Sequence, residues 1–155
     1  MQKPGNTLLR IISGGQTGVD RAALDVAIEL GLEHGGWCPQ GRRAEDGAIP
    51  HRYRLKETPE YDYSIRTRLN VQEADGTLIL YRNKLEGGSE LTAYFTRDMR
   101  KPVLAVDLEK PAATTIIKDW LSQNRICVLN VAGPRESKNP GIYKQTLDLL
   151  HNLLR

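Results

Sequence analysis

A glycine-rich turn that joins an apolar segment to an amphipathic one constrains this sequence more than any other feature. Between residues 13 and 20 the chain reads Ser-Gly-Gly-Gln-Thr-Gly-Val-Asp. The residues before it, Leu8, Leu9, Ile11 and Ile12, predict a buried strand. Apolar residues at helical spacing follow it, with Gly31 at the expected end of the helix: Val19, Ala23, Val26, Ala27 and Leu30. Glycines let backbone N–H groups approach a ligand closely, and a helix start adds unpaired donors. The pattern therefore predicts a site for a phosphate-type anion.

The details of this turn exclude two common nucleotide-binding loops. Thr17 and Asp20 have capping-box spacing, with Asp in place of Glu, which predicts a helix that begins at Gly18. No Lys follows the glycines, so the turn is not a Walker loop. Ser13 replaces the first Gly of the dinucleotide fingerprint, and the later acidic residue is missing, because that region reads Trp-Cys-Pro at 37–39. Ordinary NAD binding is not expected, and the remaining alternative is a tight turn with no ligand.

Length and composition limit the possible classes of protein. With 155 residues the chain is long enough for a sizeable core, and we interpret residues 1–155 as a single Rossmann-like domain. No apolar run approaches a membrane span and the N-terminus lacks a signal-peptide core, so a cytoplasmic location without membrane partners is expected. The net charge of +3 suits a small anionic ligand. It is too small and dispersed to indicate nucleic acid, and only 6% of the residues are aromatic.

The cysteine and histidine residues carry no metal signature. Cys38 and Cys127 have neither CxxC spacing nor a nearby His pair, so no disulfide framework or zinc site is indicated. His34, His51 and His151 are not clustered with carboxylates. The prediction is that the protein itself ligates no metal.

Strand and helix signals alternate along the rest of the chain. Strands are expected at residues 34–38, 53–56, 76–81, 103–106 and 126–131. Helices are expected from Asp62 or Ser64 to Glu73, from an N-cap at Ser89 to Met99, from Pro111 to Leu121, and from Asn139 and Pro140 to the C-terminus. The alternation predicts an α/β fold: a Rossmann-like, doubly wound sheet, mostly parallel, of about five to six strands with helices on both faces.

Two of the expected helices have unusual apolar faces. The helix ending at Glu73 has a thin face of Ile65 and Leu69, with Arg66 and Arg68 among its polar residues, so one side is expected to meet a ligand, a subunit or water. The last helix is apolar on more than one face, which favours a homo-oligomer, a dimer or a tetramer.

A polar loop is expected from residue 39 to residue 50, where proline, glycine and charge exclude regular structure. Arg42 and Arg43 could supply a fork for an oxyanion, with Glu45 and Asp46 pairing them or holding a cation. A solvated surface loop is an equal alternative.

Four unusual loops follow predicted strands, and they start at Gly14, Pro39, Arg82 and Ala132. In a parallel sheet the carboxyl ends of the strands share one edge, where ligands bind near the reversal of strand order. The four loops are therefore expected to converge on one binding site.

Together these loops resemble a known family. The segments SGGQTGVDRAALD, PQGRRAEDG, EGGSELTA and NVAGPRES are similar to those of the putative molybdenum carrier family, in a circularly permuted branch of the Rossmann-like SLOG superfamily of LOG and lysine-decarboxylase-like proteins. The likeness covers nearly the whole chain. It implies a carrier whose bound cargo is molybdenum cofactor, a phosphorylated pterin dithiolene, or a nucleotide-like anion. The resemblance implies contacts from the backbone of Gly14, Gly15, Gln16, Thr17, Gly18, Gly87, Gly88 and Ser89, with Arg42 and Arg135 as side-chain anion partners. The other ligand-binding residues that we assign in these loops are Asp20, Gln40, Gly41, Glu90 and Gly133.

The resemblance also keeps two alternatives open. The related LOG enzymes hydrolyse the N-glycosidic bond of nucleoside monophosphates with a PGGxGTxxE motif. Around Gly87 and Gly88 this chain departs from it, with Tyr94 at the position of the catalytic Glu. Glu45 or Glu90 would then have to serve as the catalytic acid of a phosphoribohydrolase. A nucleotide-sensing module that binds without chemistry is the other alternative.

Overall fold

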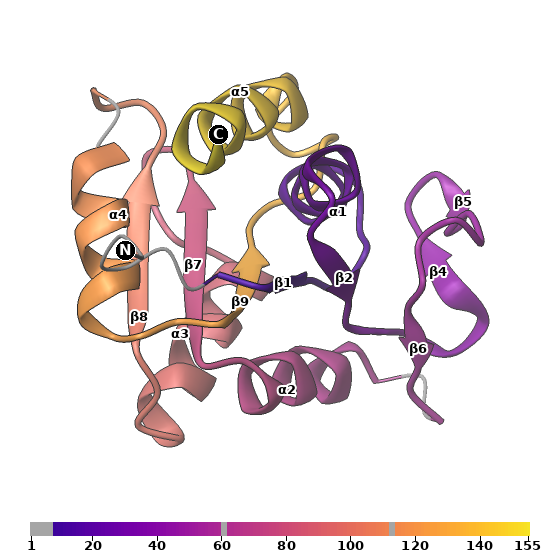
Figure 1. Ribbon diagram of the computed structural model, residues 1–155. Coiled ribbons are helices and arrows are strands. Elements are labelled where there is room, and N and C mark those ends of the chain that lie inside the picture. The colour runs from indigo at the N-terminus through magenta and orange to yellow at the C-terminus, as the bar shows by residue number, and fades with distance from the viewer. Residues whose placement is uncertain (1–7, 60–61, 112–113) are drawn as a thin grey trace.

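The computed structural model describes residues 8–59, 62–111 and 114–155 (Figure 1). Its centre is a five-stranded sheet in the order β2-β1-β9-β7-β8, and every neighbouring pair in it is parallel. The strands are β1 (Arg10–Ile12), β2 (Glu33–Gly35), β7 (Gly76–Tyr81), β8 (Val103–Asp107) and β9 (Val128–Ala132). The predicted parallel α/β sheet is confirmed. The direction in which the chain adds strands reverses between β1 and β7, and β9 fills the gap between them.

Helices cover both faces of this sheet, as predicted. One layer holds α1 (Val19–Leu30), α4 (Thr114–Gln123) and α5 (Ile142–Leu154), which pack on the main apolar core. Figure 1 shows α2 (Tyr63–Glu73) and α3 (Gly88–Asp98) on the opposite side of the sheet. Within the described ranges, none of the helices combines the length and apolar character needed to cross a membrane.

The position of α5 explains its broad apolar surface. This helix contacts α1 on one side and α4 on another. Leu150 and Leu153 are buried in the main core, and Leu147 and Leu154 pack against it. Two helices of the same chain thus account for the pattern that favoured an oligomer, so α5 no longer argues for one. Oligomerisation itself stays a prediction.

The region from residue 34 to residue 57 differs from the prediction. The expected strand at 34–38 breaks at Gly36, whose φ is +122° and whose position leaves no room for a Cβ beside the backbone of Ser13. The chain then continues as β3 (Trp37–Cys38), which pairs with β6 (Lys56–Glu57) outside the central sheet. The polar loop is also partly regular, with a 3-10 turn, η1 (Gln40–Arg42), and an antiparallel hairpin of β4 (Arg43–Ala44) and β5 (Gly47–Ala48).

Three predicted helix caps were wrong. The N-caps of α1, α3 and α5 are Gly18, Gly87 and Gly141, and no side chain caps any of the three. The Thr17 hydroxyl instead donates to Glu45, outside the helix. Tertiary contacts compete for such side chains, which spacing alone cannot reveal. Of the two caps predicted for α2, Asp62 and Ser64, the structure shows Asp62, which accepts a hydrogen bond from the Ser64 amide at 2.9 Å. The predicted start of α4 at Pro111 adjoins residues 112–113, outside the described residues.

Candidate functional site

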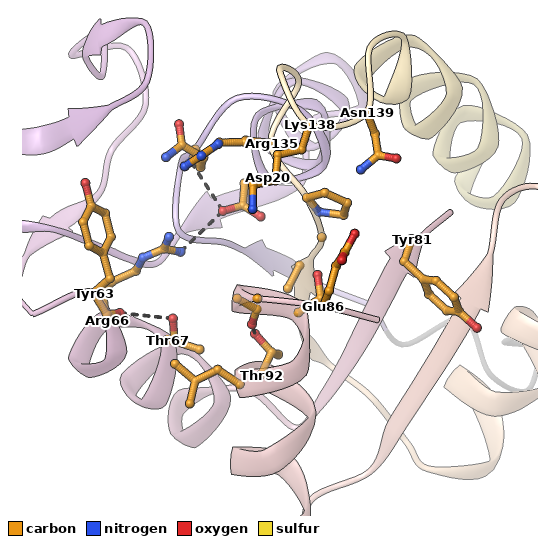
Figure 2. Close-up of a pocket in the computed structure, with 18 of the residues that line it drawn as sticks. Asp20, Tyr63, Arg66, Thr67, Tyr81, Glu86, Thr92, Arg135, Lys138 and Asn139 are labelled. Atoms are coloured by element: carbon orange, nitrogen blue, oxygen red, sulfur yellow. Dashed lines mark hydrogen bonds and ion pairs between the residues drawn. The ribbon is translucent and has the colours of Figure 1, made fainter. Parts of the chain in front are cut away.

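A pocket of about 320 Å³ opens at the carboxyl edge of the sheet, where the strand order reverses. Its walls come from the loops after β1, β7 and β9 and from the first turns of α2 and α3 (Figure 2). Three of the four loops expected to converge do so. The volume lies at the lower end of the range for small-molecule sites. The pocket-lining residues that carry charge are Asp20, Arg66, Lys84, Glu86, Arg135 and Lys138.

The structure brings together about half of the predicted ligand-binding residues. The ones that line the pocket are Gln16, Asp20, Gly87, Gly88, Ser89, Gly133 and Arg135. The ones outside its lining are Gly14, Gly15, Thr17, Gly18, Gln40, Gly41, Arg42 and Glu90. Gly14 lies just behind the pocket, where a Cβ would be 1.8 Å from Arg66 Nη1.

Three amides of the first glycine loop already donate to acceptors of the protein itself. The Gly15 amide donates to Ser13 Oγ at 3.3 Å, and the Thr17 amide donates to Gln16 Oε1 at 3.0 Å. The Gln16 amide donates to Asp20 Oδ2 at 3.4 Å. The Asp20 carboxylate therefore takes the place near the start of α1 at which we expected a ligand anion.

The second glycine loop offers donors that are not used in this way. Gly87 is the N-cap of α3, with a φ of +56° that favours glycine. Within the described part of the chain, the amides of Gly87 and Gly88 have no hydrogen-bond acceptor, whereas the Ser89 amide donates to the Glu86 carbonyl at 3.2 Å. Unpaired amides at the start of an eleven-residue helix attract an anion. Lys84 and Lys138, which also line the pocket, add positive charge around these amides.

Asp20 and Arg66 face each other in the pocket (Figure 2). Asp20 is 3% exposed, and its Oδ2 lies 3.5 Å from Arg66 Nη1. Burial raises the pKa of Asp20 to about 6, although Arg66, the Gln16 amide and Arg21 act in the opposite direction. A buried acid with a perturbed pKa beside a cation is typical of functional sites.

Arg42 has a different role from the predicted one. Its guanidinium is buried and donates to the carbonyl oxygens of Ile49, Pro50, Tyr53 and Leu55. These bonds hold the segment around the hairpin in place and leave no fork for an oxyanion. Gln40 and Gly41 lie in the same turn, where the Gly41 amide donates to Glu57 at 2.8 Å.

The other charged residues of that segment also make internal contacts. Asp46 pairs with Arg21 at 3.0 Å instead of with Arg42. The guanidinium of Arg43 lies 4.9 Å from the ring centre of Tyr63. The hairpin therefore supports the wall of the pocket from outside instead of lining it.

Neither predicted catalytic carboxylate lines the pocket. Glu45 accepts hydrogen bonds from Thr17 and from both the amide and the hydroxyl of Ser137. Its Oε1 is 3.3 Å from Arg135 Nε, so Glu45 ties the hairpin to the loops after β1 and β9. Glu90 is exposed on α3. Across the described ranges there is also no cluster of three or more His, Cys, Asp or Glu side chains placed to hold a metal ion.

Arg66 is one of the pocket residues that were not assigned from the sequence, together with Tyr63, Lys84, Glu86 and Lys138. The signal was present, because the thin apolar face of α2 left its polar side to be explained. The structure turns that side toward the loop after β1, with Arg66 and Thr67 in the pocket wall. Arg68, two residues further along, is exposed instead.

Comparison with known proteins supports the resemblance seen in the sequence. The family model described as the circularly permutated YpsA SLOG family matches residues 11–154. The crystal structure of a putative molybdenum carrier protein from Syntrophus aciditrophicus SB is 49% identical, with a TM-score of 0.95 over 99% of this chain and 98% of that chain. An (E)-4-hydroxy-3-methyl-but-2-enyl diphosphate reductase is far more distant, at 9% identity and a TM-score of 0.40 over 94% of this chain and 59% of that chain. No curated protein matches significantly.

Proposed function

Because the chain belongs to the circularly permutated YpsA SLOG family, we propose that it binds a small phosphorylated anion in the pocket between β1, β7 and β9. The observation that carries the proposal is the pair of unpaired Gly87 and Gly88 amides, which adjoin a pocket with four cationic and two acidic side chains. The phosphate would bind at the start of α3. A ring would extend toward Tyr63, an aromatic side chain that is 42% exposed at the rim.

Molybdenum cofactor is the cargo that we propose first, because a relative with 49% identity is described as a molybdenum carrier. The cofactor would be held through its phosphate and pterin, by the Gly87–Gly88 amides and the surrounding lysines, without a protein ligand to the metal. A nucleotide is the related possibility, since it also combines a phosphate with a flat ring.

The test is to purify the protein gently and identify the released ligand by mass, fluorescence and metal analysis. We expect a phosphorylated, ring-bearing molecule at close to one per chain, and binding of added cofactor by the stripped protein. Lys84→Gln should weaken that binding by about tenfold, because one charge-assisted contact is lost. Lys118→Gln on α4, outside the pocket lining, is the matched control. Stripped protein that ignores both cofactor and nucleoside monophosphates would contradict the proposal.

Hydrolysis of a nucleoside monophosphate is a second candidate, and the buried carboxylate of Asp20 favours it. Asp20 would accept a proton from the attacking water as its oxygen bonds to the anomeric carbon and the C–N glycosidic bond breaks, and the base would leave with a proton returned by Asp20. Release of free base that is lost in Asp20→Asn but kept in Glu90→Gln would support an enzyme. The absence of turnover across the common nucleotides would contradict hydrolysis and would not affect the binding proposal.

Exchange kinetics separate a carrier from a nucleotide-sensing module, which the same pocket would also serve. A carrier protects its cargo, so we expect bound cofactor to leave over hours, whereas a sensor releases nucleotide within seconds. Dilution of the loaded protein into excess unlabelled ligand measures this rate directly.

A further inference from the structure

The carboxylate of Asp20 is held by contacts that are long for a buried group. Oδ2 accepts from the Gln16 amide at 3.4 Å and faces Arg66 Nη1 at 3.5 Å. Charge-assisted hydrogen bonds normally lie near 2.8 Å. A backbone hydrogen bond from Gly133 lowers the pKa of Asp20 less than Arg66, the Gln16 amide and Arg21 do, and together these groups do not offset the effect of burial.

Arg66 is also incompletely paired. Its side chain is 17% exposed, and its buried Nε has no hydrogen-bond acceptor among the described residues. The guanidinium has room here because Gly14, directly beside Nη1, has no Cβ. Nε itself is buried, but the residue lines the pocket, so an anion that is a stronger acceptor than Asp20 can compete for the guanidinium there.

From this geometry we infer that the anionic group of a ligand replaces Asp20 as the partner of Arg66, and that Asp20 takes up a proton as the ligand binds. The inference rests on the proposed function and adds a residue, Arg66, and a coupling to pH. Asp20 would serve as an internal anion that pairs with Arg66 until the ligand binds.

The surrounding charges determine the direction of the coupling. Arg21 approaches Asp20 from α1 and Arg66 from α2. The loop after β7 adds Lys84 and Glu86, and the loop after β9 adds Arg135 and Lys138. Arg66 lowers the pKa of Asp20, so withdrawing it and adding an anion both raise that pKa above its value of about 6. An opposite charge within about 4–6 Å lowers a carboxyl pKa by roughly 1 to 3 pH units, so losing Arg66 as a partner removes a shift of that order, and the like charge of the anion raises the pKa further. Asp20 would then be protonated near neutral pH in the complex.

Sulfate is a suitable probe because it does not titrate between pH 5 and pH 8, and no histidine is among the described residues that line the pocket. We would measure its binding to the full chain by calorimetry in buffers of different ionisation enthalpy. The expected result is uptake of close to one proton per sulfate near pH 7. The affinity should fall about tenfold per pH unit between pH 6 and pH 8.

Variants separate this coupling from general charge effects. Asp20→Asn should bind sulfate without proton uptake and with the same affinity at both pH values. Glu86→Gln, which changes the other carboxylate in the pocket, should keep the pH dependence. Arg66→Gln should lose about tenfold or more in affinity, whereas Arg68→Gln, on the same helix but exposed, should not.

Each outcome has a separate meaning. Sulfate binding without proton uptake by the unaltered protein overturns the coupling and leaves the proposed function intact. Unchanged binding by Arg66→Gln overturns the role of Arg66. No sulfate binding at any pH contradicts both the inference and the anion site. If Arg66→Gln does not fold, the proton count of Asp20→Asn against Glu86→Gln still decides. An Asp20 that is protonated in the complex also cannot act as a general base, so the same measurement bears on hydrolysis.

Discussion

Two buried aspartates lie five residues apart on α1, and the protein holds them in opposite ways. Asp25 accepts short hydrogen bonds from the hydroxyls of Tyr53, at 2.6 Å, and Tyr143, at 2.5 Å. Both oxygens of that carboxylate are therefore strongly bound. Asp20 instead accepts from the Gln16 amide at 3.4 Å and lies 3.5 Å from Arg66, and a backbone hydrogen bond from Gly133 has the smallest effect on its pKa.

The difference separates a structural carboxylate from one available to a ligand. Asp25 joins α1 to α5 and to the segment before β6, since its partners come from both. The effect is also seen in Tyr53, whose pKa rises to about 12 because of burial and because its proton is donated to Asp25. Asp20 faces a pocket, joins no such network and has a raised pKa of its own. Burial alone does not distinguish the two residues; the length of their hydrogen bonds does.

Among the substitutions of these aspartates, Asp25→Ala is expected to have the largest effect on the free energy of unfolding. The substitution leaves the hydroxyls of buried Tyr53 and half-buried Tyr143 without their acceptor, so we expect a loss of about 3–5 kcal/mol in the free energy of unfolding. Urea denaturation measures it. Asp148→Ala, which removes only an exposed pair with Lys144, is the control and should cost less than about 0.5 kcal/mol. Equal losses in the two variants would end the interpretation of Asp25 as a structural junction.

Asp20→Asn is expected to increase the free energy of unfolding, whereas Asp25→Ala decreases it. The pKa of Asp20 is raised from 3.8 to about 6 in the folded chain, so the folded state binds this proton more tightly than the unfolded state. Stability is therefore lost as the pH rises from about 4 to about 6, and above that the ionised carboxylate costs roughly 1–3 kcal/mol. The Asn variant avoids this cost.

We accordingly expect Asp20→Asn to be more stable than the unaltered protein at pH 8 and equally stable at pH 4. Denaturation at the two pH values checks this. Asp25→Asn is the matched control, and it should be destabilising at both. If Asp20→Asn is instead less stable at pH 8, then the pair with Arg66 is a structural one like that of Asp25.

The sequence predicted the sheet well because its strands depend on local pattern. The strand at Gly76–Tyr81 was predicted with its observed bounds, since it is a continuous buried run. The parallel alternation then placed three of the four loops at one edge. Both results follow from hydrophobic periodicity and from the order of the elements, which the amino-acid sequence shows directly.

The partners of individual polar side chains were not predictable in the same way. Arg42 reads as an anion fork, yet it donates to four carbonyl groups that only the folded hairpin segment brings around it. Arg66 reads as one of several exposed cations, and its place in the pocket depends on how α2 packs under the loop after β1. Thr17 does not cap α1, because its hydroxyl donates to Glu45, which lies 28 residues away in sequence.

Glu45 is a third carboxylate, and its substitution is expected to change the stability least. Burial alone would raise the pKa of Glu45, but hydrogen bonds from Ser137 and Thr17 and the charge of Arg135 outweigh it, and the pKa falls below its usual range. Its contribution to stability is therefore present above the unfolded-state pKa and is lost as the pH falls through the folded-state value, opposite to Asp20. Glu45 is 22% exposed, so we expect Glu45→Gln to cost only about 1 kcal/mol at pH 7.

That cost should disappear as the pH falls through the lowered folded-state pKa of Glu45, below which the native carboxylate is itself protonated. Glu90→Gln, on an exposed face of α3, is the control and should change stability by less than about 0.5 kcal/mol. Glu45→Gln should also release Arg135, which lines the pocket, so sulfate affinity at pH 7 should rise slightly while proton uptake stays the same. If Glu45→Gln abolished proton uptake, the carboxylate that titrates on binding would be Glu45, and the contrast between Asp20 and the other two acids would no longer hold.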